Sequence, residues 1–138
     1  MDAFVVDAST AIAWVHPGQA TADSDAWLDH VTLGSELIVP AVWPLEVSNA
    51  LLVLQRRRKL TAAERTSALE ALGGMPVHLE QDSVSRVFGD ASDLATRESL
   101  SVYEATYLEL ALRRDLPLCC KDGPLRAAAL RRGVRVKP

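Results

Sequence analysis

The stretch FVVDAST, residues 4–10, decides the fold. Its three apolar residues are typical of a short buried strand, which ends at Asp7. Ser9 or Thr10 then suits the capping position of a helix, and residues 11–15 form the start of its body. The chain therefore opens with a strand, an acidic residue and a helix.

The same alternation continues to the end of the chain. Further strands are predicted at residues 36–40, 76–79 and 116–121, with a final edge strand at 134–136. Helices are predicted at residues 21–32, 44–58, 61–73, 83–97, 101–114 and 123–132. The helix over residues 83–97 has the clearest amphipathic period. Short apolar strands between helices favour an α/β fold with a parallel sheet covered on both faces.

The bulk properties fit one folded domain over residues 1–138. No apolar run approaches the roughly 20 residues of a membrane span, and the N-terminus lacks the pattern of a signal peptide. We therefore expect a cytoplasmic protein without a membrane partner. The net charge of −3 does not suggest nucleic-acid binding, although basic residues cluster at residues 56–59 and 126–137.

Four carboxylates are expected at one edge of this sheet, because ligands of parallel sheets bind beyond the carboxyl ends of the strands. Asp7 and Asp122 follow predicted strands directly. Glu46 opens the helix after the second strand, and Glu104 opens the helix before the strand that Asp122 ends. All four have mostly apolar or small neighbours, which sets them apart from acids on polar surfaces.

Four carboxylates held together repel one another unless a divalent cation compensates their charge. Oxygen-only ligands suit Mg²⁺ or Mn²⁺ rather than zinc. Such an ion supports phosphodiester hydrolysis. The pattern therefore predicts a catalytic metal site formed by Asp7, Glu46, Glu104 and Asp122.

Each acid also has a purely structural interpretation. Asp7 can cap the end of its strand, and Asp122 can cap the last helix. Glu46 lies in a first helical turn, where any carboxylate is favoured by the helix dipole. Ser101 and Glu104 have the spacing of a capping box.

Three neighbouring polar residues are candidates for substrate binding. Ser9 and Thr10 can contact a phosphate, although helix capping explains them as well. Asn49 lies one turn beyond Glu46 on the same helix face. It can contact substrate or satisfy a backbone group.

The segments VVDASTAIAW, PAVWPLEVSNALL, SVYEATYLELALRRDLPL and CKD resemble the PIN-domain ribonucleases, most closely the VapC-type toxins of bacterial toxin–antitoxin pairs. The resemblance implies a Rossmann-like α/β/α sandwich with a parallel sheet of about five strands. It also implies a Mg²⁺- or Mn²⁺-dependent endoribonuclease. Asp7, Glu46 and Asp122 match acids of the family, whereas position 104 departs from it, because these toxins usually have aspartate there.

The resemblance further implies an RNA substrate, a homodimer and a cognate VapB-type antitoxin that blocks the acidic groove, often with an arginine. Because of Glu104, an alternative is a catalytically impaired PIN fold that serves as a binding or scaffold protein. Two other α/β classes fit less well. A receiver domain needs an acid pair near the first strand, and a haloacid-dehalogenase-like phosphatase needs a second aspartate at position 9, where this chain has serine.

Overall fold

A four-stranded parallel sheet forms the centre of the computed structural model, which describes residues 1–121 and 123–138. The strand order is β3-β2-β1-β4. The strands are β1 (Ala3–Val6), β2 (Glu36–Pro40), β3 (Val77–Glu80) and β4 (Leu118–Cys119). The chain therefore builds outward from β1 in one direction and returns to place β4 on its other side. This reversal puts a topological switch point, the usual location of a ligand site, between β1 and β4.

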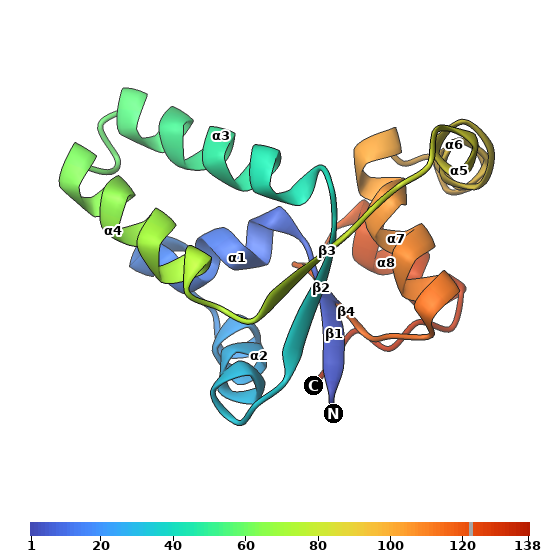
Figure 1. The fold of residues 1–138 in the computed structure, drawn as a ribbon, viewed down its shortest axis with the longest axis horizontal. Helices are drawn as coiled ribbons and strands as arrows, with labels where there is room; N and C mark the ends of the chain where they lie inside the picture. The colour runs from blue at the N-terminus through green and yellow to red at the C-terminus, as the bar shows by residue number, and fades with distance from the viewer. Residues whose placement is uncertain (122) are drawn as a thin grey trace.

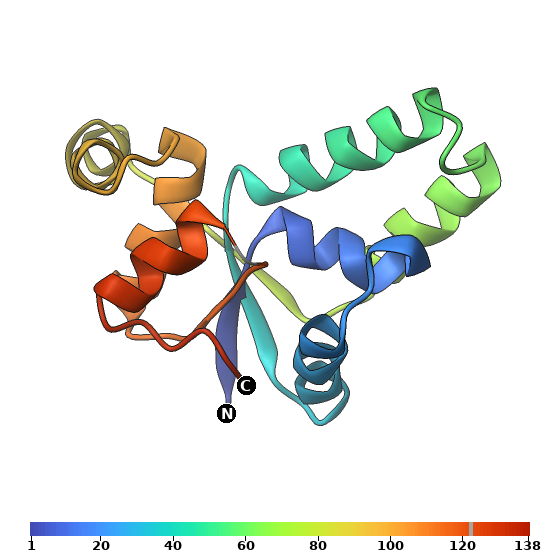
Figure 2. The ribbon, with the colours of Figure 1, turned by 180° about the vertical axis from the view of Figure 1, so that it is seen from behind.

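Helices cover both faces of the sheet, as Figures 1 and 2 show. One layer contains α1 (Ala8–Val15), α2 (Ala22–Thr32), α3 (Trp43–Arg56) and α4 (Ala62–Gly73). The other contains α5 (Val84–Arg86), α6 (Ser92–Glu98), α7 (Val102–Arg114) and α8 (Pro124–Arg131). Strands buried between two layers need apolar residues on both faces, and Phe4, Val5 and Val6 are fully buried.

The predicted α/β/α sandwich is confirmed, with one difference in the sheet. Residues 134–136 do not form the expected fifth strand. They run beside β4, where the backbone N–H of Leu118 donates to the carbonyl of Arg135 over 2.9 Å. The short β4 offers too little length for a regular ladder with this segment.

The helix predicted over residues 83–97 is irregular. Its middle is a π-helical segment, Val87–Ala91, between α5 and α6. Gly89 lies within this segment, and glycine lowers helix propensity, which makes a departure from regular α-helix easier there. The amphipathic period predicted the helical course correctly but not the change of hydrogen bonding.

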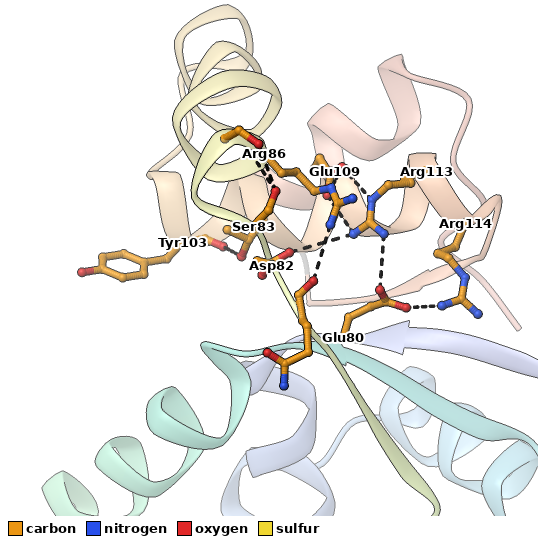
Figure 3. A network of polar contacts seen from close by, with 11 residues as sticks. Glu80, Asp82, Ser83, Arg86, Tyr103, Glu109, Arg113 and Arg114 are labelled. Atoms are coloured by element: carbon orange, nitrogen blue, oxygen red, sulfur yellow. Dashed lines mark hydrogen bonds and ion pairs between the residues drawn. The ribbon is translucent and has the colours of Figure 1, made fainter.

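Ion pairs tie α7 to the segment that follows β3 (Figure 3). Arg113 donates to both carboxylate oxygens of the buried Glu109, over 2.8 and 3.2 Å, and also contacts Glu80 over 3.3 Å. Arg86, on α5, lies 3.8 Å from the same Glu109. The network therefore fixes α7, whose first turns carry candidate site residues.

Candidate functional site

Asp7 lies where β1 ends and α1 begins. It is the N-cap of α1: its Oδ1 accepts a hydrogen bond from the backbone N–H of Thr10 over 3.0 Å. The Ser9 hydroxyl lies 2.9 and 2.8 Å from the two carboxylate oxygens. The prediction that Ser9 or Thr10 would be the cap is therefore wrong. Asp7 itself takes that position, and both residues donate hydrogen bonds to its carboxylate.

The Asp7 carboxylate is held in a half-buried position at the edge of the sheet. Its backbone N–H donates to the carbonyl of Cys119 over 3.0 Å, which ties the end of β1 to β4. Burial raises the pKa of Asp7, although hydrogen bonds from Thr10 and Ser9 and the charge of Lys121 oppose the rise. The hydrogen bonds and the charge of Lys121 therefore do not fully compensate the charged Asp7 carboxylate for its loss of water.

Glu46 lies in the first turn of α3, in the same helical layer as α1. Its Oε1 accepts a hydrogen bond from the Tyr107 hydroxyl of α7 over 2.7 Å. Burial raises the pKa of Glu46, the hydrogen bond from Tyr107 lowers it, and the charges of Asp7 and Glu104 raise it further. Asp7 and Glu104 therefore lie near enough to Glu46 for their charges to act on it, and a shared metal site stays a prediction.

Glu104 has the capping role that was one of its two interpretations. Its Oε1 accepts from the backbone N–H of Ser101 over 3.1 Å, and its own N–H donates to the Ser101 hydroxyl over 3.0 Å. Both halves of the capping box are therefore formed. Its place in a metal site stays a prediction, and so does that of Asp122, which lies outside the described residues.

Tyr107 is absent from the set predicted from the sequence. It is 2% exposed, and burial together with the hydrogen bond to Glu46 raises the pKa of its hydroxyl, which stays a protonated donor. The available signal was its spacing, because Tyr107 and Glu104 are three residues apart and share a helix face.

The residues predicted to bind substrate differ in exposure. Ser9 and Glu46 both line a cavity of about 400 Å³ between α1 and α3. Thr10 is buried, and Asn49 is exposed on α3. Thr10 also lines a second cavity of about 330 Å³, and Lys121 is another of its lining residues. Contact of Ser9, Thr10 and Asn49 with substrate stays a prediction.

The donor chemistry at this edge suits a hard divalent cation. The carboxylates that converge offer only oxygen, and burial has left two of them with a raised pKa, so a cation would relieve their repulsion. In the part of the chain that the structure describes, no three acidic, histidine or cysteine side chains are already grouped as ligands of one ion. Asp7 and Glu46 are the described residues best placed to hold Mg²⁺ or Mn²⁺.

The fold has well-defined relatives among solved structures, although no family model and no curated protein matches the sequence. PAE2754 from Pyrobaculum aerophilum is 23% identical, with a TM-score of 0.69 over 92% of this chain and 79% of that one. VapC20 of Mycobacterium tuberculosis, described as a toxin that cleaves the sarcin–ricin loop, is 17% identical, with a TM-score of 0.67 over 98% and 99% of the two chains.

A third relative is a chain of VapBC2 from Rickettsia felis, whose structure was solved bound to a DNA fragment from its promoter. It is 8% identical, with a TM-score of 0.67 over 98% of this chain and 97% of that one. These likenesses confirm the predicted PIN-domain fold.

Within residues 1–121 and 123–138, no helix combines the length and hydropathy needed to cross a membrane.

Proposed function

We propose that this chain is a metal-dependent endoribonuclease, the toxin of a VapBC-type pair. The observation that supports the proposal is the placement of Asp7 at the carboxyl end of β1 and of Glu46 in the first turn of α3, where the charges of Asp7 and Glu104 raise the pKa of Glu46. The RNA-cleaving description of VapC20 supports the same chemistry. Asp122, which follows Lys121 in the sequence, is proposed as the fourth acid.

Different residues of the proposed site bind the cation, orient the carboxylates and supply positive charge. Asp7 and Glu46 bind the cation, and Ser9 and Thr10 hold the Asp7 carboxylate in place with hydrogen bonds. A divalent cation held here supplies the Lewis acidity that phosphodiester hydrolysis requires. Lys121 supplies positive charge beside Asp7. Ser9 also lines the cavity that Glu46 lines, so a substrate phosphate bound there would lie beside it.

The RNA backbone also needs positive charge, which the net charge of −3 does not provide. Arg56, Arg57, Arg58 and Lys59 are exposed at and just beyond the C-terminal end of α3. A helix rises about 1.5 Å per residue, so this group lies roughly 15–20 Å from Glu46 along α3. We propose that it contacts phosphates several nucleotides from the cleavage site.

The central experiment measures cleavage of RNA by purified protein with Mn²⁺ or Mg²⁺, with EDTA as the metal-free control. The matched variant is Asp7→Asn, because asparagine is also a good N-cap and leaves the start of α1 intact. We expect cleavage to require metal and to fall at least about 100-fold in the variant. Equal metal-dependent cleavage by a folded Asp7→Asn protein would contradict the proposal.

The second candidate function is a PIN fold that binds RNA or protein without cutting. The capping box at Glu104 favours it, because a carboxylate engaged by Ser101 is not committed to a cation. RNA binding in a gel-shift assay, without cleavage in any divalent cation, is the result that selects this alternative.

The proposed antitoxin binds at the same site as the RNA substrate. The cavity between α1 and α3 is lined mostly by apolar residues and has Glu46 on its wall, which suits an antitoxin segment that brings an apolar side chain and an arginine. We propose a VapB-type antitoxin there and a homodimer of this chain. Co-expression with the product of a small upstream gene should suppress cleavage, and light scattering should give twice the chain mass.

A further inference from the structure

The hydrogen bond between Tyr107 and Glu46 joins the two helical layers at the edge of the sheet. Glu46 lies on α3, Tyr107 lies on α7, and these helices cover opposite faces (Figure 1). The two residues are 61 positions apart in the chain, and the donor–acceptor distance is 2.7 Å. This contact is therefore a product of the complete fold.

The hydroxyl holds a carboxylate in an orientation that electrostatics alone disfavours. Glu46 has three side-chain torsions, so it can turn toward water and away from the charges of Asp7 and Glu104. The Tyr107 ring is 2% exposed and has little freedom to follow such a movement. A hydrogen bond to Oε1 from this fixed ring restricts the rotation and keeps the carboxylate near the other two acids.

We propose that Tyr107 is a positioning residue, whose hydroxyl fixes the Glu46 carboxylate in the orientation that binds the divalent cation. One oxygen is engaged by tyrosine, and the second, Oε2, is directed by the same bond. The inference rests on the proposed function, because it assigns Glu46 to the cation. Hydrogen-bonded partners of ligating side chains commonly contribute about 10-fold or more to metal affinity.

The test is Mn²⁺ binding by isothermal titration calorimetry to the full-length protein and to Tyr107→Phe, which removes only the hydroxyl. The matched control is Tyr103→Phe, one helical turn earlier, where the side chain is 63% exposed. We expect the Mn²⁺ affinity to fall about 10-fold in Tyr107→Phe and to stay within about 2-fold in the control. RNA cleavage at limiting Mn²⁺ should fall in parallel, and excess Mn²⁺ should restore part of it.

A double-mutant cycle separates positioning from a general structural effect. Glu46→Asp keeps the carboxylate, but its side chain is one methylene shorter and no longer reaches the Tyr107 hydroxyl. Tyr107→Phe should therefore have little further effect on Mn²⁺ affinity in that background. An undiminished loss in that background overturns the inference, as does wild-type Mn²⁺ affinity in Tyr107→Phe with reduced thermal stability. A wild-type protein that neither binds Mn²⁺ nor cuts RNA overturns the proposed function, and the role of Tyr107 with it.

Discussion

At the scale of single residues, Glu104 has two possible partners for one carboxylate. In the structure it completes the capping box with Ser101. Its charge nevertheless acts on Glu46, so it lies near the proposed cation site. A cap hydrogen bond is worth only about 1 kcal/mol, which a divalent cation can outweigh. Glu104 can therefore act as a cap without the ion and as a ligand with it.

Glu104→Gln separates these roles, because glutamine also completes a capping box but carries no charge. We expect the Mn²⁺ affinity and the rate of RNA cleavage to fall about 10-fold, while the thermal midpoint of the metal-free protein changes little. Isothermal titration calorimetry measures the Mn²⁺ affinity, an RNA cleavage assay measures the rate, and differential scanning calorimetry measures the thermal midpoint. Unchanged affinity and cleavage would show that Glu104 is only a cap.

The raised pKa of Asp7 predicts how the stability of the protein depends on pH. Its folded pKa lies above its ordinary value of 3.8, mainly because of burial. As pH rises past that value, the unfolded chain loses the proton before the folded protein does, so wild-type stability falls relative to Asp7→Asn. The loss is complete once pH exceeds the raised folded pKa.

We therefore expect Asp7→Asn to be more stable than the wild type at pH 7 in metal-free buffer, with the gain shrinking toward pH 3. Urea unfolding from pH 3 to pH 8 measures it. Equal stability of the two proteins across this range would show that the Asp7 charge is compensated.

At the scale of elements, α7 connects the site with the network in Figure 3. Its first two turns carry Glu104 and Tyr107, and its last turns carry Glu109 and Arg113. Glu109 is buried, and its carboxylate depends on Arg113, with Arg86 farther away. The helix that carries Tyr107 is therefore anchored near its other end by ion pairs to Glu80 on β3 and to Arg86 on α5.

Arg113→Ala should destabilise the protein by about 3 kcal/mol, because it leaves a buried carboxylate without its main partner. The matched control is Arg114→Ala: Arg114 pairs with Glu80 at a more exposed position, and its loss should cost under about 1 kcal/mol. Urea unfolding compares the two variants. A smaller loss for Arg113→Ala than for Arg114→Ala would contradict the assigned importance of Glu109.

At the scale of the whole molecule, the proposed cation links the two helical layers. Asp7 follows β1, Glu46 belongs to α3 in one layer, and Glu104 belongs to α7 in the other. An ion bound by carboxylates from separate elements binds the folded state far better than the unfolded chain. Metal binding should therefore stabilise the complete fold.

Mn²⁺ at about 100 times its dissociation constant should add about 2.7 kcal/mol of stability, or roughly 10 °C in the thermal midpoint. EDTA should reverse the shift, and Asp7→Asn should show little of it. Differential scanning calorimetry provides the measurement. A shift of equal size in Asp7→Asn would place the ion elsewhere in the molecule.

The amino-acid sequence by itself indicated most of the helices and strands and the positions of the acids along them. Apolar runs such as Phe4–Val6, cap residues such as Thr61 and Ser101, and the acid after the first strand act over three or four residues, which a local pattern reports. Asp7 and Glu46 were therefore placed at the correct edge, since parallel strands share their carboxyl ends.

The tertiary structure alone decided the contacts between distant segments. The hydrogen bond from Tyr107 to Glu46, the burial of Glu109 against Arg113 and the failure of residues 134–136 to form a strand depend on how α3, α7 and β4 pack. Such contacts follow from distances across a closed core, and no periodicity in the chain encodes them. For this reason the sequence located the carboxylates, whereas only the fold revealed the hydroxyl that holds one of them.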